Sequence, residues 1–167
     1  EADLALAEEL HESIGQALAA TQVRHNLGWV AARRGDVPLA LERYDRVEAE
    51  YRAHGVPLAL LLMDRCEVLL SARLAGEAKA NADAAVAELG AAGLGADLAE
   101  ARLLAAHAEL LVGNTAAARD HAVHAAHAFV RQHRPGWAAL CRAAAAEAAW
   151  AEVDRPPDGS DGARPAL

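Results

Sequence analysis

Residues that break helices recur along this 167-residue chain at a fixed interval. Gly35-Asp36 and Gly113-Asn114 lie 78 residues apart, and the segment 74–78, which contains another glycine, lies near their midpoint. The interval is therefore about 39 residues. Self-similarity at such a period is typical of repeat proteins, in which each unit buries its apolar face against the next. No other feature of the sequence restricts the fold as strongly.

A second set of breakers lies half an interval from the first, at 54–57, 93–96 and 134–136. Two breaks per unit indicate two helices per unit, so each unit is a helical hairpin. Asp36 and Asn114 precede predicted helices and are expected to act as N-caps, because a side-chain oxygen accepts from a free first-turn amide. The predicted helices span about 2–12, 15–34, 37–53, 57–73, 76–92, 96–112, 115–132 and 136–152.

Composition favours the same fold. The chain has 46 Ala and 23 Leu, which are strong helix formers, but only 11 Val and one each of Ile and Phe. β-branched and aromatic residues are therefore too few to build a sheet. We expect an all-α solenoid of stacked antiparallel helical hairpins.

One helical-repeat domain is predicted over residues 1–153. The segment 154–167 is rich in Pro, Gly and Asp and is predicted to be a disordered tail or linker. Because the chain begins with Glu instead of Met, we expect it to be part of a longer protein. Within the domain we expect hairpin units at about 15–53, 57–92 and 96–132, with half-repeats at 1–12 and 136–152.

The net charge of −8 argues against two classes of partner. Nucleic acids and anionic membranes attract clustered Lys and Arg, whereas this chain has 16 basic and 24 acidic residues. No stretch free of Asp, Glu, Lys and Arg is longer than 53–63, which has 11 residues, whereas a membrane span needs about 20. The first residues form no basic leader, and two cysteines are too few for a disulfide framework. We expect a cytoplasmic protein that contacts neither nucleic acid nor membrane.

The first hairpin carries a Leu-Gly pair, a Gly-Asp turn, a small residue and an aromatic residue at Leu27-Gly28, Gly35-Asp36, Ala40 and Tyr44. This pattern resembles a tetratricopeptide repeat (TPR). The resemblance implies that the paired helices cross most closely at Gly28 and Ala40, and that Tyr44 fills the gap to the next hairpin.

The later hairpins depart from this pattern. Cys66 and Ala106 replace the glycine of the crossing, and Ala82 and Ala122 replace the aromatic residue. The interval of about 39 residues also exceeds the usual TPR period of about 34. HEAT-like hairpins, with periods of about 40–47 residues, are the alternative fold.

Three segments carry a more specific resemblance: 25–36 (HNLGWVAARRGD), 64–70 (DRCEVLL) and 93–102 (GLGADLAEAR). They are similar to the TPR arrays of actinobacterial CHAT-domain proteins, in which such repeats precede a caspase-like cysteine peptidase domain. The resemblance implies a scaffolding or sensing module for protein binding, non-catalytic by itself, within a larger peptidase protein. The TPR region of an actinobacterial transcriptional regulator or another signalling protein is the alternative.

A caspase-like domain requires a His-Gly pair and a nucleophilic cysteine. The one His-Gly pair, His54-Gly55, lies at a predicted turn, where glycine is expected as a helix cap. Cys66 and Cys141 lie among apolar residues of predicted helices and are expected to pack as small hydrophobic groups. We therefore expect no enzyme activity from these residues and place any peptidase domain outside them.

Histidines cluster in one predicted helix. His121, His124 and His127 recur every third residue, with His107 on the preceding helix, and such neighbours can share a metal ion. The alanines and Phe129 define the inward face of this helix, so the histidines are expected on its outer side. No metal and no other cofactor is predicted.

In TPR arrays the first helix of each hairpin lines a concave groove. The resemblance therefore implies a partner-binding groove for a protein or peptide segment or for another helical repeat. Acidic residues dominate its second and third units, so we do not expect it to accept an acidic C-terminus. Trp29 has an alternative role, packed between hairpins. The groove residues that the resemblance implies are Gln22, His25, Asn26, Trp29, Arg33, Met63, Asp64, Glu67, Ser71, Glu100, Leu103 and His107.

The last predicted helix offers Trp137, Leu140 and Trp150 instead of the polar cap with which repeat arrays end. We expect it to expose an apolar face that self-associates or contacts another repeat.

Overall fold

The computed structural model describes residues 2–153, which form eight helices and no strand. This confirms the predicted all-α fold. The predicted tail at 154–167 lies outside the described residues. The helices are α1 (Ala2–Ser13), α2 (Ala17–Arg33), α3 (Val37–Ala53), α4 (Ala59–Ser71), α5 (Ala75–Ala92), α6 (Gly95–Val112), α7 (Thr115–Arg131) and α8 (Pro135–Val153).

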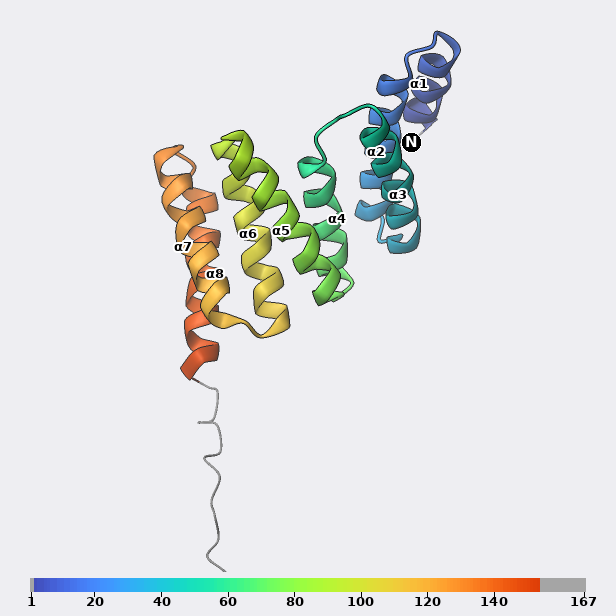
Figure 1. Ribbon diagram of the computed structural model, residues 1–167. Helices are drawn as coiled ribbons and strands as arrows, with labels where there is room; N and C mark the ends of the chain where they lie inside the picture. The colour runs from blue at the N-terminus through green and yellow to red at the C-terminus, as the bar shows by residue number, and fades with distance from the viewer. Residues whose placement is uncertain (1, 154–167) are drawn as a thin grey trace, which may run out of the picture.

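The helices stack side by side into an elongated array, with α1 at one end and α7 and α8 at the other (Figure 1). Each helix packs against the next along the chain. In addition, α2, α4, α6 and α8 contact one another in order, so they form one layer, with α3, α5 and α7 behind it. The layer whose helices approach each other is the inner, concave layer of a solenoid. Within the described range, no helix combines the length and the apolar character needed to cross a bilayer.

A residue in the left-handed backbone conformation ends each helix before the next begins. Five of these residues are glycine, but Arg73 (φ 57°) and His133 (φ 56°) are not. Pro135 already begins α8, and Gly76 lies within the first turn of α5, so neither expected breaker provides the left-handed residue. The left-handed positions recur every 18 to 20 residues, at Gly15, Gly35, Gly55, Arg73, Gly93, Gly113 and His133.

The closest helix crossing lies in the first full hairpin, between α2 and α3. Gly28 is buried there, and a Cβ on it would lie 2.6 Å from Cε1 of Tyr44. Tyr44 is fully buried and clusters with Leu61 and Val68 of α4. The expected close approach at Gly28 and the packing of Tyr44 toward the next hairpin are therefore present.

The later hairpins use smaller pairs at the same crossing. Cys66 and Ala82 lie in one core cluster, and Ala106 and Ala122 lie in another. At these later crossings a small side chain on the first helix of the hairpin therefore shares a core cluster with an alanine on the second.

One of the two expected N-caps is formed. Oδ1 of Asp36 accepts from the Leu39 amide at 3.2 Å at the start of α3. Asn114 has a similar backbone conformation before α7, but its side chain makes no capping hydrogen bond. The side-chain cap predicted at Asn114 is therefore not formed.

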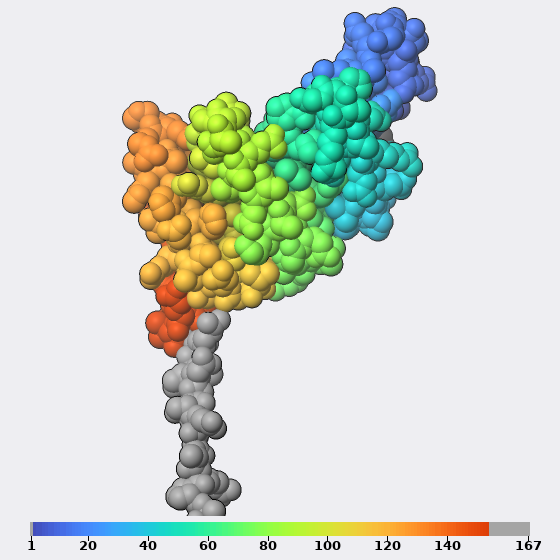
Figure 2. Space-filling view, in the orientation of Figure 1, coloured from blue at the N-terminus to red at the C-terminus, as the bar shows by residue number. Residues whose placement is uncertain are grey.

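At both ends of the array, the terminal helix is only partly covered by its neighbours. α1 has no buried side chain and projects at the N-terminal end (Figure 2). Arg24 of α2 holds it, through ion pairs with Glu8 at 2.7 Å and with Glu12, and also pairs with Glu50 of α3 at 2.6 Å. At the other end α8 leaves Trp150 73% exposed, as expected for a helix without a polar cap.

Candidate functional site

The inner layer is hollowed along its length into three adjoining depressions. The central depression, of about 470 Å³, lies between α2, α4 and α6. Its lining is polar and apolar in similar measure and includes three carboxylates. Its lining residues are Gln22, His25, Asn26, Tyr51, Leu60, Met63, Asp64, Glu67 and Glu100.

The second depression, of about 330 Å³, is mostly apolar and reaches α8. Its rim includes Leu140, which is 55% exposed, and His107, whose pKa is lowered by burial. The lining residues are Met63, Glu67, Leu70, Glu100, Leu103, Leu104, His107, Trp137 and Leu140.

The third depression, of about 110 Å³, lies at the α2 end. It is lined by Trp29, Ala32, Arg33, Tyr44, Asp64, Glu67, Val68 and Ser71. Glu67 belongs to all three depressions, and Met63, Asp64 and Glu100 each belong to two. The depressions therefore form one continuous groove, and every residue that the TPR resemblance implied for the groove lines it.

The structure adds groove residues that the sequence did not place there. Leu140 and Trp137 of α8 close one end of the groove, whereas the sequence predicts for them an exposed face that contacts another repeat or a second copy. The repeat interval could have placed them there. Equivalent turns at Gly93 and His133 lie 40 residues apart, and the same step leads from Glu100 to Leu140.

His25 fastens the floor of the groove. Its Nε2 lies 2.9 Å from Oδ2 of Asp64, and its Nδ1 lies 3.3 Å from the hydroxyl of Tyr51. A neutral ring protonated at Nε2 satisfies both, because Nε2–H donates to the carboxylate and the Tyr51 hydroxyl donates to Nδ1. The ring also stacks edge-on against Tyr44. His25 thus ties α2 to α3 and α4 and donates a hydrogen bond to the Asp64 carboxylate.

Three carboxylates at the centre differ in their hydrogen-bond and ion-pair partners. Asp64 is held by His25, and Glu100 accepts from Nη1 of Arg134 at 2.6 Å. Glu67 makes no hydrogen bond or ion pair with any part of the chain between residues 2 and 153. Burial raises the pKa of the Glu67 carboxyl, and the negative charge of Asp64 raises it further.

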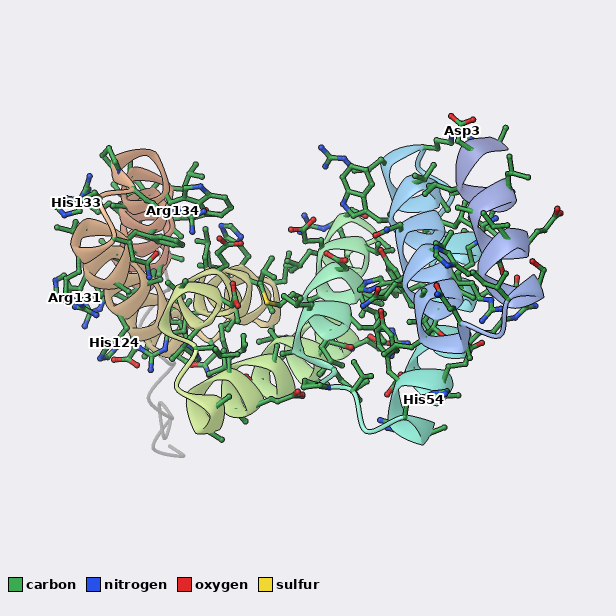
Figure 3. All side chains as sticks on the ribbon, turned by 90° about the horizontal axis from the view of Figure 1, so that it is seen from above. Asp3, His54, His124, Arg131, His133 and Arg134 are labelled. Atoms are coloured by element: carbon green, nitrogen blue, oxygen red, sulfur yellow. The ribbon has the colours of Figure 1, made fainter. Side chains whose placement is uncertain are left out.

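A cation and an aromatic ring meet at each end of the groove. At one end, the Arg33 guanidinium lies 5.3 Å from the centroid of Trp29, which is 43% exposed. Trp29 is therefore a groove residue and is not packed between hairpins. At the other end, Arg134 lies 4.7 Å from the Trp137 ring. Figure 3 shows Arg134 on the side of α7 and α8 that faces the rest of the array.

The histidines that recur in the sequence lie in different surroundings in the structure. His107 lies in the groove, while His124 is exposed on the outer side of α7 (Figure 3). His121 is half-buried, contrary to the expectation that it lies on the outer side, because it packs toward Asp83 and Glu109. These three residues present ligand atoms within 4.8 Å of one another and could hold a metal ion.

A lysine already neutralises the acidic part of that group. Nζ of Lys79 lies 2.8 Å from Asp83 and 2.5 Å from Glu109, which is buried. Lys79 is the one lysine in the sequence. An ion pair that neutralises a buried carboxylate accounts for the cluster as part of the packing between α5 and α6.

The two cysteines are packed in the core, and the His-Gly pair forms a helix end. Cys66 is buried, its Sγ lies 3.4 Å from the Ala78 carbonyl oxygen, and burial raises the pKa of its thiol to about 12. Burial also raises the pKa of the Cys141 thiol. His54 is the C-cap of α3, and Gly55 follows with φ +66°, as expected for a helix end.

No known protein family, curated protein or solved structure matches this chain. The fold therefore rests on the structure, and a functional assignment rests on the groove and on the sequence resemblance.

Proposed function

We propose that this chain is a TPR-type helical-repeat module that binds a protein segment in its concave groove and has no catalytic role of its own. The observation that carries the proposal is the continuity of the groove. Residues from α2, α4, α6 and α8 line adjoining depressions that share Glu67.

The dimensions and lining suit a peptide. The two larger depressions, of about 470 and 330 Å³, each lie in the range of ligand pockets, but they adjoin along the array instead of forming one enclosed cavity. An elongated groove with apolar and charged parts is the geometry by which proteins bind extended or helical segments. Exposed aromatic and arginine side chains at its ends, such as Trp29 and Arg33, are of the types that dominate binding energy at interfaces.

The larger context follows from the resemblance. We infer that the module belongs to a CHAT-type peptidase protein, in which it senses or scaffolds, with a transcriptional regulator or another signalling protein as the alternative. Sequencing the coding region on both sides distinguishes them. A neighbouring strand-rich domain with a His-Gly pair and a later cysteine supports the first, and a helix-turn-helix or nucleotide-binding domain supports the second.

The groove assignment is tested with peptides selected from a displayed library of random 12-residue sequences. The double variant Trp29→Ala, Arg33→Ala is expected to weaken binding of the selected peptides by at least tenfold. The matched control Leu6→Ala, Arg131→Ala removes a large apolar side chain and an arginine from exposed positions outside the groove and should leave binding unchanged. Equal binding by both double variants would refute the assignment.

Self-association through α8 is a second candidate contact. Trp150 and Val153 are exposed near the end of this helix, and large exposed apolar groups mark interaction sites. Light scattering should show association that rises with concentration and is reduced by Trp150→Ser. A strictly monomeric chain at high concentration would count against it.

A further inference from the structure

We propose that the segment bound in the groove presents a Lys or Arg side chain to Glu67 and, close to it along the segment, an apolar side chain to the depression formed by Leu103, Trp137 and Leu140. This inference rests on the proposed function of the groove and specifies the chemistry of the partner.

Glu67 lies where the three depressions of the groove meet. It lines all three depressions, so a segment lying along the groove must pass it. Its carboxylate is accessible from the groove, because the residue is exposed despite its position near the middle of the inner layer.

The three carboxylates of the groove are not equally paired within the chain. Asp64 has His25 as a partner and Glu100 has Arg134, but Glu67 has none within the described residues. Arg33 is the cation that acts on Glu67, and it lies over the Trp29 ring. A carboxylate that is partly desolvated and close to two others gains most from a cation supplied by a partner.

An apolar depression adjoins Glu67. Leu103 and Leu104 form part of its wall, and Trp137 and Leu140 of α8 remain exposed at its rim. Glu67 and Glu100 line this depression as well as the central one. A cation at Glu67 and an apolar anchor therefore contact adjoining parts of the groove, so the two side chains lie close together along the bound segment.

Charge complementarity excludes the opposite kind of segment. An acidic segment would add negative charge beside Asp64, Glu67 and Glu100, on a chain whose net charge is already −8. Juxtaposed like charges suppress binding of wrong partners and slow their encounter. The groove thus selects a basic and apolar segment.

The experiment begins with the same displayed library of random 12-residue peptides, screened against the whole chain. Selected peptides should be enriched in Lys or Arg within three positions of Leu, Phe or Trp. For the strongest binder, Glu67→Gln should weaken binding about tenfold, as expected for loss of a charged hydrogen bond. The matched control Glu77→Gln changes an exposed carboxylate on α5 outside the groove and should have no effect.

The pairing is tested by changing the peptide as well. Replacing its basic residue by neutral citrulline should weaken binding to the wild-type chain but not to Glu67→Gln, so the two changes are not additive. Likewise, Leu140→Gln should reduce the apolar preference, whereas Leu6→Gln on the exposed face of α1 should not.

The outcomes separate this inference from the proposed function. Peptides that bind in the groove with no basic enrichment, or with citrulline and Glu67→Gln effects that simply add, would overturn the inference and leave groove binding in place. If the chain, shown to be helical by circular dichroism, binds no peptide of any composition, the proposed function fails and the inference fails with it.

Discussion

The Tyr44 ring lies directly against the backbone of Gly28, in the space that a Cβ on residue 28 would occupy. Gly28→Ala should therefore destabilise the chain by about 1–2 kcal/mol, because the overpacking cost exceeds the gain in helix propensity. Gly90→Ala is the matched control in open space and should stabilise by up to about 1 kcal/mol. Urea denaturation measures both. Adding Tyr44→Ala should remove the penalty at residue 28, and additive effects of the two changes would contradict this account.

Arg73 should benefit from replacement by glycine. Its φ of 57° is unfavourable for a residue with a Cβ, whereas Gly113, at the equivalent turn, has φ +82° without that cost. Arg73→Gly should stabilise by about 0.5–1 kcal/mol and Gly113→Ala should destabilise by about 1 kcal/mol, measured by thermal unfolding. A loss of stability in Arg73→Gly would show that the arginine side chain stabilises this turn.

α1 should depend on Arg24. Because α1 buries no side chain, its attachment rests largely on the pairing of Arg24 with Glu8 and Glu12. In Arg24→Met, amide hydrogen exchange should accelerate over residues 2–13 and remain unchanged in α4 to α8. Arg46→Met is the control, since Arg46 pairs with Glu42 on its own helix, and equal exchange in the two variants would refute the role of Arg24.

Local signals explain why the fold could be predicted. Helix ends follow from breakers and caps close in sequence, so predicted bounds such as 57–73 differ from α4 (Ala59–Ser71) by two residues at each end. Arg73 and His133 carry no such signal, because the backbone adopts a left-handed turn there without glycine.

The groove could be predicted only in part. Periodicity transfers positions between units, so residues on the first helix of each hairpin, such as Trp29 and Glu67, could be placed on one face. It does not give contacts between distant side chains. The link from His25 to Tyr51 and Asp64, which leaves Glu67 as the unpartnered carboxylate, depends on three helices meeting and is visible only in the structure.

The ionised Glu67 carboxylate should lower the stability of the folded state near neutral pH. Its folded-state pKa is raised by burial and by Asp64, while Arg33 of α2 opposes and Glu100 of α6 adds to the shift. The carboxyl is protonated in both states at low pH, so the penalty is absent there and grows as pH rises through the raised pKa. Glu67→Gln should therefore unfold at an equal or higher temperature than wild type at pH 7, with the difference vanishing in acid.

The same titration should govern binding. Affinity for a basic peptide should fall as pH decreases through the raised pKa of Glu67, and Glu67→Gln should lack this component. A pH profile that is identical in the two proteins would separate Glu67 from the bound cation.

The most direct test of the groove is photo-crosslinking of a library-selected peptide to the chain. A benzophenone amino acid is placed either at Gln22, which is exposed in the central depression, or at Asp120, which is exposed on α7. The account predicts a cross-link from position 22 that excess unlabelled peptide abolishes, and none from position 120. Cross-linking from position 120 with none from position 22 would contradict binding in the concave groove.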